Sequence, residues 1–228
     1  MTRIETSIRV LLADDQTMVR QGIRALLSFA QDVVVVAEAA NGHEAIELAH
    51  HASPHVVLMD IHMPLVDGIA ATQRIRAELP DVAVIILTTF DHDASVIDAI
   101  RAGACGFLLK DGDGDDLLRA VRLAAEGDAV IAPRLLGRLL TTIALTARDG
   151  RAAQECLISL TDRERDVLSL IATGRNNAEI ADTLHVGEAT VKTHIGHLFA
   201  KLAIRDRAQA VVAAYESGLV LPGASQES

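Results

Sequence analysis

The chain has 228 residues, of which 50% are hydrophobic and 23% are charged, and its formal net charge is −10. This balance is typical of a globular protein and excludes disordered, collagen-like and small disulfide-stapled chains. The two cysteines, Cys105 and Cys156, lie far apart and form no metal-ligand motif, so we expect reduced thiols. No apolar run is long enough for a membrane span and no signal-peptide pattern is present, so we expect a cytoplasmic protein without a membrane partner.

The negative charge belongs to the first half of the chain. Residues 1–128 carry 10 Lys and Arg against 20 Asp and Glu, whereas the remaining residues carry 11 of each kind. Because the second half is balanced, it can still present a locally basic surface to an anionic partner.

Five short apolar runs alternate with amphipathic segments in the first half. The runs cover residues 8–14, 33–39, 55–60, 82–89 and 106–110. Their β-branched and leucine-rich composition is typical of parallel strands that are covered on both faces. Between and after them, helical spacing of apolar residues covers about 19–30, 43–51, 67–78, 92–102 and 115–126. The alternation predicts an α/β domain, residues 1–128, with a doubly wound parallel sheet of five strands and five helices.

The second half is predicted to be helical. Residues 129–156 have the pattern of a helical linker, in which Pro133 starts a leucine-rich segment before the sequence becomes polar. Residues 157–221 form the predicted second domain, and residues 222–228 a disordered tail.

Four helices are expected in the second domain. The first is opened by the capping-box pair Thr161 and Glu164, and the others cover about 177–184, 188–202 and 206–217. A short helix, a turn that contains Gly187 and a longer helix together indicate a helix-turn-helix.

Polar residues follow four of the predicted strands. They are Asp14, Asp15, Asp60, Thr88 and Lys110. Because the carboxyl ends of parallel strands share one edge of a sheet, these side chains should converge. Clustered carboxylates need a cation and suit Mg²⁺, and a carboxylate beside Mg²⁺ and a lysine is a plausible nucleophile for a phosphoryl group.

Two other metal sites are less favoured by the sequence. In the acidic run of residues 111–116, a calcium loop would need glycine at Asp116 and glutamate at Arg122. The histidines at positions 50, 51, 55 and 62 are scattered over different predicted elements, which favours solvated or structural roles.

Residues 7–126 contain the Asp14–Asp15 pair and the runs LMDIHMPLVDG, LTTF and GACGFLLKD. In these motifs, in this order, the segment resembles the response-regulator receiver domain. It implies that Asp60 accepts a phosphoryl group from a sensor histidine kinase. It further implies the following roles: Mg²⁺ held by Asp14, Asp15, Asp60 and the backbone carbonyl of His62, phosphoryl oxygens bound by Thr88 and Lys110, and a switch formed by Thr88 and Phe107.

The second domain contains the runs LTDRERDVL, NNAEIADTL, TVKTH and KLAIRDRAQAV. In these runs it resembles a LuxR-type DNA-binding domain, and together with the first domain it resembles the NarL/FixJ arrangement of transcriptional regulators. The resemblance implies promoter DNA as a partner, with RNA polymerase as a further candidate. It places Lys192 and Thr193 at base edges. Residues expected at or beside the DNA backbone are Thr190, His194, His197 and Lys201, and those expected at a homodimer contact, formed on phosphorylation or DNA binding, are Val211, Val212 and Tyr215.

Two alternatives remain beside this non-enzymatic regulator. The same architecture could bind DNA without phosphorylation. A phosphatase with an aspartyl-phosphate intermediate is less favoured, because such enzymes need a second carboxylate two residues after the nucleophile, where this chain has His62.

Overall fold

The computed structural model describes residues 7–88, 94–127, 130–131, 157, 159–204 and 206–220. The chain divides into two compact units, residues 1–135 and 136–228. The elements of the first unit are β1 (Ile8–Ala13), α1 (Thr17–Ser28), β2 (Val33–Ala39), α2 (Gly42–Ala52), β3 (Val56–Asp60), α3 (Gly68–Glu78), β4 (Ala83–Thr88), α4 (Ala94–Arg101), β5 (Gly106–Leu109), α5 (Gly114–Ala125) and β6 (Val130–Ile131).

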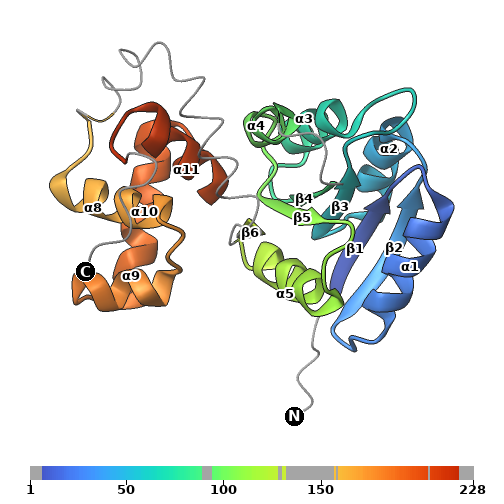
Figure 1. The fold of residues 1–228 in the computed structure, drawn as a ribbon, viewed down its shortest axis with the longest axis horizontal. Helices are drawn as coiled ribbons and strands as arrows, with labels where there is room; N and C mark the ends of the chain where they lie inside the picture. The colour runs from blue at the N-terminus through green and yellow to red at the C-terminus, as the bar shows by residue number, and fades with distance from the viewer. Residues whose placement is uncertain are drawn as a thin grey trace. The chain divides into compact units, whose positions relative to one another are not determined.

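The first unit is built on a parallel sheet with helices on both faces. The strand order is β2-β1-β3-β4-β5-β6. Helices α1 and α5 cover one face, and α2, α3 and α4 cover the other (Figure 1). The order reverses between β1 and β3, which is where ligands bind in open α/β sheets. The predicted doubly wound architecture is therefore confirmed.

The burial of the strands explains why their apolar runs can be recognised in the sequence. All residues of β3 and β4 are buried, as expected for strands packed on both faces. The side chains of Leu12, Leu58 and Ile85 from three adjacent strands lie in one core with Leu27 of α1 and Val121 of α5. This core fixes the ends of β1 and β3 beside each other.

Strand β6 is not among the strands that the sequence predicts. It pairs in parallel with β5, with Val130 opposite Gly106 and Ile131 opposite Phe107. Two residues are too few to show a periodic pattern, and they fall where the linker of residues 129–156 was expected. The helix expected after Pro133 and the tail of residues 222–228 lie outside the described residues.

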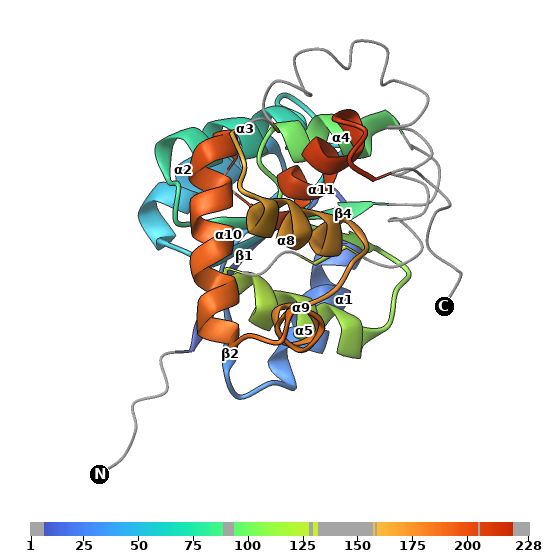
Figure 2. The same ribbon diagram turned by 90° about the vertical axis from the view of Figure 1, so that its left-hand side faces the viewer.

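The second unit consists of helices among its described residues. They are α8 (Asp162–Ala172), α9 (Asn177–Leu184), α10 (Glu188–Leu202) and α11 (Arg207–Glu216). Helix α8 packs against both α10 and α11, and α9 packs against α10. Figure 2 shows α10 along its full length. The predicted helix positions and the capping box of Thr161 and Glu164 are confirmed.

The turn between α9 and α10 uses a histidine rather than its glycine for the left-handed residue. His185 ends α9 with a φ of 53°. Gly187 precedes α10 with a φ of −79°, which any residue can adopt. The glycine in this turn is therefore not required by its backbone angle.

The described helices include none with both the length and the apolar character that a membrane crossing needs.

Replacing Gly68 tests how tightly the β3–α3 loop is held. A Cβ atom there would overlap the carbonyl oxygen of Asp60, so Gly68→Ala should lower the free energy of unfolding by about 2 kcal/mol. Gly22 of α1 has nothing within 4 Å of a built Cβ. The control Gly22→Ala should therefore raise the stability by about 0.5–1 kcal/mol. Urea unfolding followed by circular dichroism measures both, and equal stability of the two variants would contradict this packing.

Candidate functional site

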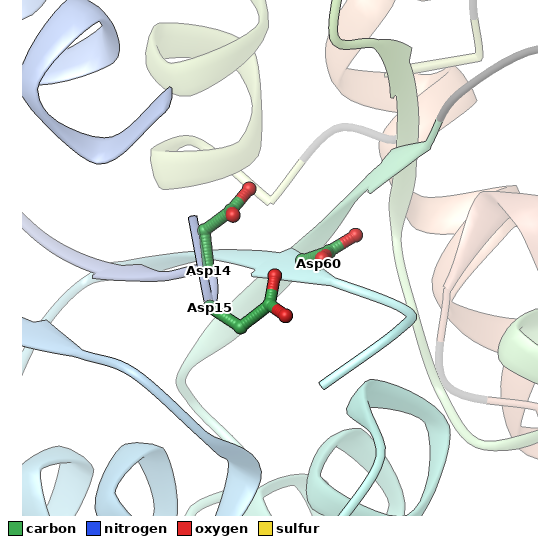
Figure 3. Close-up of side chains that lie close together, drawn as sticks. All are labelled: Asp14, Asp15 and Asp60. Atoms are coloured by element: carbon green, nitrogen blue, oxygen red, sulfur yellow. The ribbon is translucent and has the colours of Figure 1, made fainter. Parts of the chain in front are cut away.

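Three carboxylates meet at the ends of β1 and β3. Asp14 and Asp15 follow β1, and Asp60 is the last residue of β3 (Figure 3). One oxygen of each carboxylate lies within 4.8 Å of the other two. Asp14 is fully buried and Asp60 is 3% exposed, whereas Asp15 is exposed. The predicted convergence of these residues is confirmed.

Lys110 bridges the two buried carboxylates. Its Nζ lies 2.7 Å from Asp14 Oδ2 and 2.9 Å from Asp60 Oδ1. Its peptide N–H donates to the carbonyl of Thr88 at 2.9 Å, which fixes the chain after β5 against the end of β4. One ammonium therefore offsets two carboxylates in a region with little solvent, where an uncompensated charge is costly.

The same contacts shift the pKa values of the site. Burial raises the pKa of Asp60 above its ordinary value, although the hydrogen bond and charge of Lys110 oppose this. Burial alone would lower the pKa of Lys110, but its hydrogen bonds to Asp14 and Asp60 outweigh burial and raise it. The lysine is thus held protonated, as a fixed positive charge at this site.

Backbone contacts position the acidic residues. The peptide N–H of Gln16 donates to Asp14 Oδ1 at 2.8 Å, and the Arg20 guanidinium donates to the Asp14 carbonyl at 2.6 Å. In the loop after Asp60, the Gly42 N–H donates to the carbonyl of Val66 at 3.0 Å. The sequence predicts no role for Arg20 or Gly42, because neither residue belongs to a recognisable catalytic or binding motif.

Thr88 and Phe107 lie on the neighbouring strands β4 and β5. Thr88 ends β4 and is buried. The ring of Phe107 in β5 is 0% exposed, and without a hydroxyl it leaves no hydrogen-bonding group unsatisfied there. The resemblance implies that this ring is part of a switch, and in the structure the ring is buried.

The donor set fits Mg²⁺. Asp60 Oδ2 is buried and has no hydrogen-bond partner among the described residues. The three clustered side chains offer only carboxylate oxygens, the hard ligands that Mg²⁺ prefers. A cation at this place would give the unpartnered oxygen its missing interaction.

The histidines take part in no such cluster within the described part of the chain. His50 Nε2 lies 2.7 Å from Glu78 Oε2, and His55 Nδ1 accepts from the Arg9 N–H at 3.1 Å. These contacts agree with the structural and solvated roles that we expected.

Helix α10 presents an exposed polar face. Val191 and Leu198 are fully buried, whereas Lys192 and Thr193 are exposed. Three further residues of α10 are expected to contact DNA. Thr190 and His197 are exposed, and His194 is half-buried. The hydroxyl of Thr193 donates to the carbonyl of Ala189 at 3.0 Å.

Lys201 forms an ion pair with Glu164 that the sequence does not predict. Its Nζ lies 2.6 Å from Oε2 of Glu164, which is 4% exposed. This hydrogen bond and that of the Thr161 backbone lower the pKa of Glu164 to about 2. The two residues are 37 positions apart, so helical periodicity gave no signal of the pair.

The three residues expected at a dimer contact are buried in the single chain. Val211, Val212 and Tyr215 are 3%, 6% and 8% exposed, and the Tyr215 hydroxyl donates to the Ala172 carbonyl at 3.3 Å. A side chain buried in its own chain has little surface left for a second copy. In this arrangement they are therefore not accessible to a partner.

Family models and relatives agree with both units. Residues 10–122 match the response regulator receiver domain, and residues 158–214 match the bacterial regulatory proteins of the luxR family. Transcriptional regulatory protein YxjL of Bacillus subtilis is 42% identical over 93% of this chain and 97% of its own length. Response regulator protein VraR of Staphylococcus aureus is 39% identical over 94% of this chain and 99% of its own length.

A solved structure extends the likeness to the backbone. ChrA, the response regulator of a heme-sensing two-component system, is 37% identical with a TM-score of 0.53, covering 94% of this chain and 100% of that chain. The chain belongs to the two-component response regulators that join a receiver domain to a LuxR-type DNA-binding domain. Its relatives are DNA-binding transcriptional regulators, and the two domains imply a sensor kinase and DNA as partners.

The lowered pKa of Glu164 predicts an acid-sensitive contribution to stability. This carboxylate has a folded pKa of about 2 and an ordinary value of 4.5. Its stabilising contribution is complete above the ordinary value and is lost as the pH falls from 4.5 toward about 2. Wild type should therefore be more stable than Glu164→Gln at neutral pH, and this difference should shrink over that interval.

Fluorescence of Tyr215 measures this difference in the second unit. It is the chain's only tyrosine, and the chain has no tryptophan. A stability difference that stays constant across the interval would contradict the ion pair with Lys201.

Proposed function

We propose that Asp60 accepts a phosphoryl group from a sensor histidine kinase and that this reaction controls DNA binding by the second domain. The observation that carries the proposal is the pair of buried carboxylates of Asp14 and Asp60, both of which contact the ammonium of Lys110. A carboxylate next to a fixed positive charge can approach an anionic donor that it would otherwise repel.

In the proposed reaction, an oxygen of Asp60 attacks the phosphorus atom, and the bond from phosphorus to the donor breaks. Lys110 is already in contact with the attacking carboxylate and would then bind a phosphoryl oxygen. The hydroxyl of Thr88 would bind another. Mg²⁺ held by Asp14, Asp15, Asp60 and the His62 carbonyl would neutralise charge on the transferred group.

Phosphorylation would act on the chain through Thr88 and Phe107. The modification adds up to about two negative charges beside Lys110. Thr88 lies at the end of β4, where its hydroxyl can bind the phosphoryl group, and Phe107 lies on the neighbouring strand β5, opposite Ile86 of β4. Movement of Thr88 toward the phosphoryl group would vacate space into which the Phe107 ring can rotate, and the buried position of the ring in this structure is compatible with the end point of that rotation.

In the second domain, the exposed face of α10 would enter the major groove of promoter DNA. Lys192 and Thr193 would contact base edges, and Thr190, His194 and His197 would contact the backbone. Their exposure supports this assignment for all but the half-buried His194. Lys201, the remaining residue expected at the DNA backbone, is bound to Glu164 in this structure.

Homodimer formation is part of the proposal, because two half-sites multiply the binding free energy of one helix-turn-helix. A contact through Val211, Val212 and Tyr215 would require their present covering to change. The dimer would act in the cytoplasm on promoter DNA, with RNA polymerase as a further partner. The phosphatase alternative remains less favoured, because the position two residues after Asp60 is His62 and not the second carboxylate that such an enzyme needs.

Phosphorylation is tested with a small phosphodonor and Mg²⁺. The wild-type chain should gain the mass of one phosphoryl group and bind DNA more tightly, whereas Asp60→Asn should gain no mass. Intact-mass spectrometry and a DNA titration of the same samples give both readouts. Mass gain without a change in DNA affinity would support the phosphorylation-independent regulator.

The DNA-contacting role of α10 is tested with Lys192→Ala. This variant should bind DNA more weakly, and the slope of log K against log salt should fall by about one, because a cation at a base edge in the groove also displaces counterions from the neighbouring phosphates. Phosphorylation of Asp60 should be unchanged. Arg119→Ala, which removes an exposed cation of α5, serves as the control and should leave the slope unaltered.

A further inference from the structure

The contact between Glu164 and Lys201 joins two helix ends that are distant in sequence. Glu164 is in the first turn of α8, and Lys201 is in the last turn of α10. Oε2 of Glu164 accepts from the Thr161 N–H at 2.8 Å, from the Thr161 hydroxyl at 2.9 Å and from Lys201 Nζ at 2.6 Å. One buried oxygen thus serves both the cap of α8 and the end of α10.

A second capping box in the same domain shows that capping alone requires no such lysine. Glu179 accepts from the Asn176 N–H at 2.8 Å and caps α9, but it is exposed. Among the described residues, it has no ion-pair partner. Glu164 performs the same capping while buried and bound to Lys201, so its ion pair has a purpose beyond the cap.

The position of the pair determines what it can restrain. Helix α10 is fixed at its beginning by the turn after α9, where the Val186 N–H donates to the Ala181 carbonyl at 3.0 Å. At its other end, the ion pair ties Lys201 to the start of α8. The helix dipoles favour both charges, because the Glu164 carboxylate lies at the N-terminus of α8 and the Lys201 ammonium at the C-terminus of α10. The ion pair is therefore stabilised further in this orientation.

We infer that Lys201 is a positioning residue, which sets the orientation of α10 through Glu164 and does not itself bind a DNA phosphate. The inference rests on the proposed function, in which Lys192 and Thr193 of the same helix contact DNA. To reach a phosphate, Lys201 would have to leave a buried carboxylate without its cation, which is unfavourable.

The experiment exploits the opposite signs that two mechanisms predict for Glu164→Gln. The full chain first selects a duplex from a random-sequence pool, and this duplex is the probe. Glutamine keeps the cap, because it also accepts from the N-cap N–H, but it removes the charge that holds Lys201. If only net charge mattered, losing a negative charge would strengthen DNA binding. With α10 held by the pair, Glu164→Gln should weaken binding about fivefold, whereas the matched control Glu179→Gln should bind as tightly as wild type or tighter.

Lys201→Met provides the second variant. It should weaken binding by a similar factor and leave the salt slope at the wild-type value, in contrast to Lys192→Ala, whose slope falls by about one. Lys201→Arg, which can still reach Glu164, should restore affinity. Tyr215 fluorescence at the assay temperature confirms that each variant is folded, so that a loss of stability alone is separated from a loss of affinity.

Two results would overturn the inference. One is a salt slope for Lys201→Met that falls as far as that of Lys192→Ala, which would make Lys201 a cation in direct contact with DNA. The other is unchanged affinity in folded Glu164→Gln and Lys201→Met. Failure of the proposed function looks different: the wild-type chain selects no duplex, or Lys192→Ala binds as wild type does, and the inference falls with it.

Discussion

The receiver site depends on one ammonium that contacts two buried carboxylates. Lys110 lies at the end of β5, and Asp14 and Asp60 lie at the ends of β1 and β3, so the sheet must hold three strand ends in register for the contacts to form. Without the lysine, two carboxylates would be buried beside each other. The fold therefore holds the positive charge of Lys110 at the place where an anionic group would bind.

A similar constraint, on a smaller scale, organises the second domain. There the buried carboxylate of Glu164 has Lys201 as its cation among the described residues, and the two partners lie at helix ends instead of strand ends. In both domains a charge taken out of solvent fixes the geometry of a neighbouring surface. In the receiver that surface is the acidic site itself, and in the second domain it is the exposed face of α10.

The sequence predicted those features that local pattern determines. Buried strands such as β3 and β4 are continuous apolar runs, and capping residues such as Thr161 mark helix starts, so the elements and the convergence at Asp60 were readable. Strand β6 was missed because two residues carry no period. The partner of Lys201 and the burial of Tyr215 depend on how helices pack across long separations, which a helical wheel does not contain.

The central claim is that Lys110 compensates the two buried carboxylates. Amide hydrogen exchange of β1 and β3 in wild type and Lys110→Met, each without and with Mg²⁺, tests it most directly. Without Mg²⁺, the variant should lose about 3 kcal/mol of protection in these strands, because its buried carboxylates have lost their cation. Mg²⁺ should restore more protection to the variant than it adds to wild type. Equal protection of both proteins without Mg²⁺ would contradict the account.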